Sequence, residues 1–130
     1  MDTSLVKAET VELLSRITGQ KLNQEDVTPP VIFLAALITV LLGVIFADDQ
    51  VTEEEKQRLQ VTLNKFIPSE GNVRQLTKVM LKEIRENLDD YKKPTQLFKL
   101  TSSFSKSEKL LLISFGYEMS AADGTMNGCP

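Results

Sequence analysis

Apolar residues recur at intervals of three and four along most of this chain, which is the period of an amphipathic α-helix. The first such segment spans Ser4–Thr18. Gly19 is placed to end it, because glycine readily adopts the left-handed conformation that terminates many helices. A polar connector then leads to Thr28. The apolar positions of the first predicted helix are Leu5, Ala8, Val11, Leu14 and Ile17.

The stretch Val31–Asp49 differs because it is apolar on every face until it ends in two aspartates. Thr28 is placed as its N-cap and Pro29 as its first helical residue. A helix of this kind must be buried on all sides, either at the centre of a helical domain or in lipid. It is shorter than the about 20 apolar residues that a bilayer core requires. We therefore predict a central buried helix and no membrane insertion; solubility without detergent would exclude the membrane alternative.

Four further helices follow this central segment. Thr52 and Glu55 form a capping-box pattern that opens a helix ending near Pro68. Ser69 or Asn72 is placed to cap the next helix, which keeps the helical period as far as Leu88. We expect the following apolar positions to face the core: Leu59, Leu63, Phe66, Val73, Leu76, Met80, Ile84 and Leu88.

The C-terminal part begins with Asp89–Pro94, which we interpret as a turn, with Tyr91 as a turn residue. A short helix is predicted around Leu97, Phe98 and Leu100. Ser105 and Glu108 repeat the capping-box pattern and open a last helix, KLLLISFGYEMSAAD, that is again apolar nearly all round. We expect this helix to be buried like the central one, with Tyr117 half-buried.

These elements predict an all-α protein, a compact bundle of about six helices forming a single domain over residues 1–130. A chain of 130 residues buries about two thirds of its unfolded surface, enough for one core. Residues 1–28 form the N-terminal helix and connector, 29–126 the core, and 127–130 a tail.

Composition excludes several classes of function. The net charge of −3 argues against nucleic-acid binding, and we expect the basic stripe of Arg74, Lys78, Lys82 and Arg85 to be solvated surface. Histidine is absent, which removes the commonest general base and transition-metal ligand. No nucleophile motif or phosphate-binding loop occurs, so we predict neither an enzyme nor an organic cofactor.

Cys129 is the only cysteine, so it forms no internal disulfide and nothing requires an oxidising compartment. We expect a cytoplasmic protein. Cys129 is either a reactive thiol or part of a disordered tail.

Carboxylates gather where the two most apolar helices end. The segment Phe46–Val51 aligns with Ala121–Met126 as a weak internal repeat. Carboxylates offer only hard oxygen ligands, which suit Ca²⁺, Mg²⁺ or Mn²⁺. The alternative is structural: acids before a helix N-terminus and an Asp-Gly turn are ordinary. The predicted metal ligands are Asp48, Asp49, Glu54, Glu55 and Asp123, with Glu118 nearby in sequence.

An apolar helix ending in Ala47-Asp48-Asp49, a hydrophobic residue two positions on, and then Thr52 before Glu53-Glu54-Glu55 resembles the tellurite-resistance TerB family. A second partial copy begins at Ala122-Asp123-Gly124. The resemblance implies an all-helical domain with pseudo-twofold halves, a pseudo-twofold internal repeat whose acidic elbows meet at a divalent-metal site. By position, Asp48 and Asp123 match the elbow aspartates, and Glu54 or Glu55 matches the following acid. It also implies a role in tellurite or metal stress.

The same resemblance leaves a second role open, because TerB-like domains also occur as modules of DnaJ-type co-chaperones. In that role the acids would face a protein partner. The family pattern continues beyond Met126 with an acidic helix, whereas Asn127–Pro130 closes this sequence. We therefore expect either a truncated C-terminal end or the absence of the second acidic set, and a homodimer over the face left uncovered is one further expectation.

Overall fold

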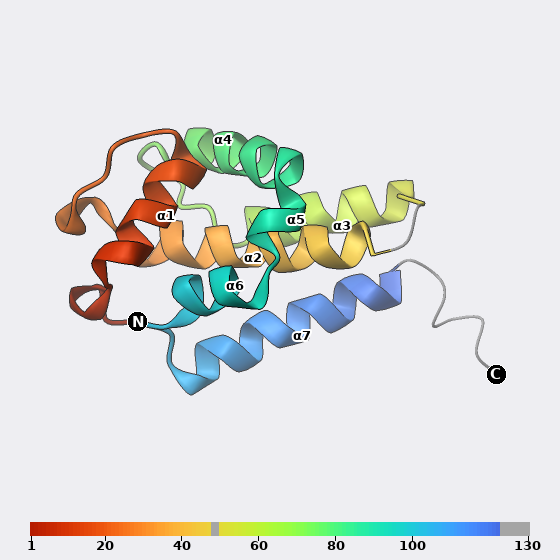
Figure 1. The fold of residues 1–130 in the computed structure, drawn as a ribbon. Coiled ribbons are helices and arrows are strands. Elements are labelled where there is room, and N and C mark those ends of the chain that lie inside the picture. The colour runs from red at the N-terminus through yellow and green to blue at the C-terminus, as the bar shows by residue number, and fades with distance from the viewer. Residues whose placement is uncertain (48–49, 123–130) are drawn as a thin grey trace.

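The computed structural model describes residues 1–47 and 50–122, and these contain helices and no strand. The all-α prediction is confirmed. The described residues form seven α-helices instead of about six, because the predicted turn after Leu88 contains a short helix of its own. The helices of Figure 1 are α1 Ala8–Thr18, α2 Pro29–Ile45, α3 Glu53–Asn64, α4 Val73–Glu86, α5 Leu88–Tyr91, α6 Pro94–Thr101 and α7 Lys106–Ala122.

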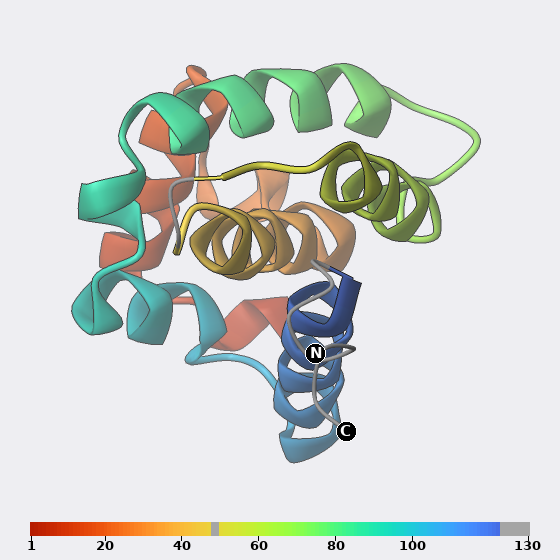
Figure 2. The same cartoon turned by 90° about the vertical axis from the view of Figure 1, so that its right-hand side faces the viewer.

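Helix α2 lies at the centre of the bundle and contacts each of the other α-helices in the described residues. Figures 1 and 2 show α4 on one side of it and α7 on another. Twelve of its 17 residues are buried, so the prediction of a central buried helix is confirmed. The segments that the structure describes contain no helix long and apolar enough to cross a membrane.

Helix ends follow the expected local chemistry in most places. Pro29 occupies the first turn of α2, where its missing N–H costs nothing. Gly19 ends α1 with a φ of 69°, and its N–H donates to the Arg16 carbonyl. Ser105 and Glu108 form a reciprocal capping box before α7: each backbone N–H donates to the other side chain, at 2.9 and 3.2 Å.

The first predicted helix is wrong at its start. Instead of one helix from Ser4, a short 3₁₀ turn covers Thr3–Leu5, Val6 is extended, and α1 begins at Ala8. The side chain of Asp2 caps the turn by accepting from the Ser4 N–H at 3.0 Å. This local cap favours a separate turn, and it leaves Leu5 exposed although Val6 is buried.

Four phenylalanines connect α2 with α7 and with the segments that follow α3 and precede α7. Phe33 of α2 lies 4.9 Å from Phe66, between ring centroids, and 5.8 Å from Phe104. Phe66 in turn meets Phe115 of α7 edge to face at 5.3 Å. Tilted and edge-to-face pairs at these separations add to the stabilisation from burial. The cluster therefore fixes α7 and the end of α3 onto the central helix.

The expectation that the last helix is buried like α2 is wrong. One face of α7 packs on the core through Leu112, Phe115 and Met119. The opposite face exposes large apolar side chains, with Tyr117 74% exposed instead of half-buried. Besides Tyr117, the exposed large apolar residues of α7 are Leu110, Leu111 and Ile113. Helix α7 lies at the edge of the bundle, mainly against α2 and α3, and nothing in the described chain covers its outer side.

Candidate metal centre at the elbow between α2 and α3

The elbow joins the end of the central helix to the start of α3. Helix α2 ends at Ile45, and the backbone N–H of Phe46 still donates to the Leu42 carbonyl at 2.9 Å. Phe46 and Ala47 are exposed, whereas Val51 is half-buried against the core. The chain therefore leaves the core at the end of α2 and returns to it at Val51, immediately before α3.

The predicted capping box at the start of α3 is confirmed. The Thr52 side chain accepts from the Glu55 backbone N–H at 3.1 Å, and the Thr52 N–H donates to Glu55 Oε1 at 2.9 Å. These bonds satisfy two backbone donors that a helix N-terminus otherwise leaves free. They also bend the Glu55 side chain back over the elbow instead of letting it extend into solvent.

Glu55 is consequently a buried carboxylate, with only 1% of the residue exposed. Its Oε1 accepts from the Thr52 N–H and lies 3.3 Å from the Thr52 hydroxyl. Its Oε2 is buried and has no hydrogen-bond partner among the residues described. A buried charge without a partner is costly, and such an atom in a native structure calls for a water or an ion to satisfy it. A hard cation fits this oxygen chemically.

The other predicted ligands divide into two groups. Glu54 lies in the first turn of α3 and is exposed. Asp48, Asp49 and Asp123 lie outside the described residues. Within the described ranges, no three acidic or cysteine side chains gather closely enough to hold a metal ion. The structure thus distinguishes the two glutamates, one buried and one exposed, which sequence spacing treated as equivalent.

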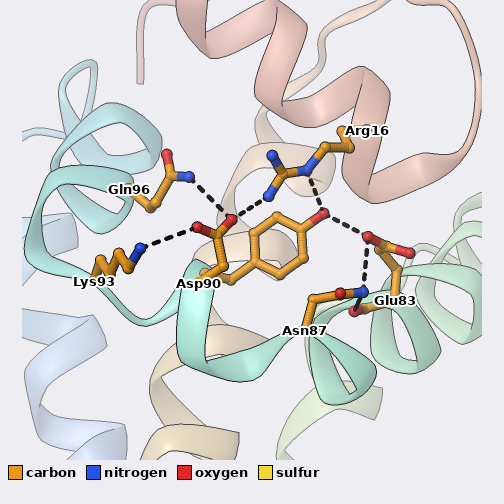
Figure 3. Close-up of polar contacts among 7 residues, drawn as sticks. Arg16, Glu83, Asn87, Asp90, Lys93 and Gln96 are labelled. Atoms are coloured by element: carbon orange, nitrogen blue, oxygen red, sulfur yellow. Dashed lines mark hydrogen bonds and ion pairs between the residues drawn. The ribbon is translucent and has the colours of Figure 1, made fainter.

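A second polar cluster, which sequence analysis missed, surrounds Tyr91 (Figure 3). Tyr91 is the last residue of helix α5, so its interpretation as a turn residue is wrong, and it is fully buried. Its hydroxyl accepts from Arg16 Nε at 2.9 Å and donates to Glu83 Oε2 at 2.6 Å. The Arg16 guanidinium also lies 4.6 Å from the centre of the Tyr91 ring. Burial raises the pKa of the Tyr91 phenol, and the bond to Glu83 acts in the same direction.

The same arginine forms an ion pair with Asp90. The hydrogen bond from Arg16 is the main reason why the pKa of Asp90 is lowered, and Gln96 and Lys93 add smaller contributions. We call Arg16, Glu83, Asp90 and Tyr91 the Tyr91 clasp. It connects α1, α4 and α5, and its polar groups satisfy one another, so we assign it a structural role. The DDY sequence before a proline predicts a turn, and only the long-range contact with Arg16 explains the burial.

The chain was compared with models of known protein families. Residues 34–128 match the model of the tellurite resistance protein TerB. The chain belongs to the TerB family. The match covers more than half of the chain, beginning within α2 and including α3 to α7. The chain matches none of the curated proteins and none of the solved structures with which it was compared.

Membership of the TerB family confirms the resemblance first seen in the acids that follow α2. The buried Glu55 and the exposed Glu54 both lie within the matched range. The proposed repeat between Phe46–Val51 and Ala121–Met126 stays a prediction, because its aspartates lie outside the described residues. Helix α1 precedes the matched range, although its Arg16 holds the Tyr91 clasp together.

Proposed function

We propose that this TerB-family chain binds a divalent metal ion, Ca²⁺, Mg²⁺ or Mn²⁺, at the elbow between α2 and α3. The observation that carries the proposal is the buried Oε2 of Glu55, which has no partner among the described residues. A cation would supply the missing interaction and repay the cost of burying the carboxylate.

The ligand set follows from the chemistry of the elbow. Glu55 would offer Oε2, since Oε1 is already used by the capping box. Asp48 and Asp49 belong to the same elbow by sequence, and Asp123 follows α7. Glu54 is exposed and would act only by adding negative charge nearby. Oxygen-only ligands favour hard cations over zinc or copper.

The role we propose is non-catalytic. The family description concerns tellurite resistance, and a metal-binding domain without catalytic groups suits a role in tellurite or metal stress in the cytoplasm. No organic cofactor is required for this role.

A second role, as a protein-interaction module, rests on a different observation. Glu53 and Glu54 are exposed in the first turn of α3, where a basic partner could reach them. In that role the buried Glu55 would serve only the capping box. The two roles therefore assign different importance to Glu54 and Glu55, which differ by one position in sequence.

The experiment compares Glu55→Gln with Glu54→Gln in metal-stripped protein. Glutamine at the third helical position still completes a capping box, so both variants should fold. A cation at about 100 times its dissociation constant should add about 2.7 kcal/mol to the unfolding free energy of wild type. We expect Glu54→Gln to keep this response. Glu55→Gln should lose it while being no less stable than wild type without metal, because it removes the negative charge from a buried side chain whose Oε2 has no partner among the described residues.

Calorimetric titration with each ion gives the affinity directly, and the midpoint of thermal unfolding gives the linked stability. If no ion binds wild type, or if Glu55→Gln binds the ion as tightly as Glu54→Gln does, the elbow is not the metal site. The protein-interaction role would then explain the acidic residues better, and Glu54→Gln would be the variant that weakens binding of a basic partner.

A further inference from the structure

One side of α4 presents a row of positive charge that the metal proposal does not use. Arg74, Lys78, Lys82 and Arg85 are all exposed and recur at intervals of four, four and three residues, so they follow one side of the helix. None of the four forms an ion pair with another described residue; Arg74 donates a hydrogen bond to Asn64 at 3.2 Å. We call these four residues the basic rim. The chain as a whole has a net charge of −3, so the basic rim is a positively charged surface on an acidic protein.

The basic rim borders an apolar groove between α3 and α4. Both helices pack on α2 but make few contacts with each other. This hollow has a volume of about 90 Å³. Its apolar lining is Leu59, Leu63 and Ile67 on the α3 side and Leu81 on the α4 side, and Gln60, Asn64, Arg74, Thr77 and Lys78 complete it. Leu59, Ile67 and Leu81 are only partly buried, so they offer apolar surface to another molecule. Two of the hollow's polar lining residues, Asn64 and Arg74, are joined by a hydrogen bond.

The groove continues along the outside of α4. Lys78 and Leu81 line both the hollow beside α3 and a second hollow of about 510 Å³, which is also bordered by Lys82, Arg85 and Glu86. Three cations and one carboxylate therefore surround a shared apolar residue. The surface follows most of α4, which at 1.5 Å per residue is about 20 Å long.

We propose that this groove docks an acidic amphipathic helix from a partner protein. The apolar side of such a helix would cover Leu59, Ile67 and Leu81, with glutamates or aspartates along its edge facing the basic rim. Helices that bind in grooves place apolar anchors at intervals of three and four residues, and opposite charge along the rim sets their orientation and association rate. Charge complementarity therefore identifies the occupant as acidic.

The same features disfavour a nucleic acid as the occupant. Single strands bind to basic grooves that also offer aromatic rings for stacking. The two hollows are lined by aliphatic, polar and charged residues, without an aromatic ring. The ring of Phe46, beside the end of the basic rim, already lies 5.8 Å from the Arg85 guanidinium. Covering the leucine and isoleucine side chains of the groove with apolar side chains lowers the free energy, whereas contact with phosphate groups does not. A partner with both apolar and acidic side chains would contact the apolar residues of the groove and the basic rim at the same time.

The test measures binding of a designed, fluorescein-labelled helical peptide of about 16 residues, a length that follows α4. The peptide carries leucines at helical spacing and glutamates along both edges. Binding to the full chain is followed by fluorescence anisotropy. We expect saturable binding that weakens with added salt. We expect Lys78→Glu/Lys82→Glu to weaken it at least about tenfold, because two attractions become repulsions.

Matched controls separate the groove from general charge. Lys21→Glu/Lys109→Glu makes the same change in net charge at exposed positions elsewhere and should change the affinity less than about twofold. A peptide of the same composition in scrambled order should bind at least about tenfold more weakly. Circular dichroism and thermal melting check that both double variants keep the fold.

The proposal fails if the peptide does not bind, if the scrambled peptide binds equally well, or if both double variants weaken binding alike. It also fails if a single-stranded oligonucleotide binds more tightly than the peptide at the same salt concentration. Self-association that Lys78→Glu/Lys82→Glu abolishes, measured by sedimentation, would identify a second copy of the chain as the occupant and would likewise overturn it.

Discussion

Helices α2 and α7 are each 17 residues long and apolar on nearly every face of their sequence, yet they are buried to very different extents. Around α2, apolar side chains on every face are covered by neighbouring helices. On α7, Leu112, Phe115 and Met119 are buried, while Leu110 and Ile113 are 57% and 53% exposed. Figure 2 shows the reason, since α7 lies at the edge of the bundle.

The difference shows that apolar composition sets which residues can be buried, whereas the arrangement of the chain decides which ones are. Helix α2 has α4, α7 and the α1, α5 and α6 group around it. The outer side of α7 has no such neighbour in the described residues. Side chains of equal hydrophobicity therefore contribute differently to the free energy of unfolding in the two helices. Substitutions can measure that difference.

The largest effect is expected from a matched truncation in the two helices. Leu37 of α2 is fully buried, whereas Leu110 of α7 is mostly exposed. Leu37→Ala should lower the free energy of unfolding by about 2 to 5 kcal/mol, because it removes buried methyl groups and leaves a cavity. Leu110→Ala should change it by no more than about 0.5 kcal/mol. Urea unfolding measures both, and equal losses would mean that the outer side of α7 is covered.

A smaller effect is expected where the two helices meet. A Cβ on Gly116 of α7 would lie 3.2 Å from Val40 Cγ1 of α2, closer than an ordinary contact, whereas a Cβ on Gly43 would meet nothing within 4 Å. We expect Gly116→Val to cost about 1 to 3 kcal/mol by overpacking. Gly43→Ala should instead gain up to about 1 kcal/mol through helix propensity. The midpoint of thermal unfolding gives both signs.

Adding Val40→Ala to Gly116→Val tests whether this single contact is responsible. If the steric account is right, the double variant recovers part of the loss and the two changes are not additive. Strict additivity would show that Gly116→Val acts elsewhere on α7.

The smallest of the three effects concerns the Tyr91 clasp, which connects α1, α4 and α5. Tyr91→Phe removes the hydroxyl that links Arg16 to Glu83. We expect a cost of about 1 to 2 kcal/mol, since both lost hydrogen bonds involve charged groups but Arg16 is half exposed to water.

The clasp also predicts an alkaline pH dependence. The pKa of Tyr91 is raised in the folded protein, so folding favours the protonated phenol. Its contribution is complete below the unfolded pKa of about 10 and is lost as pH rises through the folded value. Urea unfolding between neutral and alkaline pH should show a steeper loss of stability in wild type than in Tyr91→Phe. Parallel curves would show that the phenol is not perturbed.

Local chemistry made several features predictable. Thr52 with Glu55 and Ser105 with Glu108 are capping boxes in sequence and in the structure, because their bonds span only three residues. Gly19 and Pro29 mark helix ends for similar reasons. The TerB resemblance was also visible, since the order of features after α2 is contained within ten residues and agrees with the family match over residues 34–128.

Features that depend on distant parts of the chain were not predictable. Tyr91 was interpreted as a turn residue, but its burial depends on Arg16, 75 positions earlier. Leu110 was expected to be buried and Tyr117 half-buried, because nothing in the helix itself shows that α7 lies at an edge. Glu54 and Glu55 were equivalent by spacing, and only the bend of the capping box against the core buries one of them.

By itself, then, the sequence determined the helical class, the two capping boxes, the central place of α2 and the family. These features follow from hydrogen bonds and periodicities within a few residues, or from a segment that has no polar face to offer to water. Tertiary structure alone decided which face of α7 is covered, why Tyr91 is enclosed, and which glutamate of the elbow is buried with an oxygen that has no partner among the described residues. Burial and unmet hydrogen bonds are properties of an atom's surroundings, and those surroundings come from residues far away along the chain.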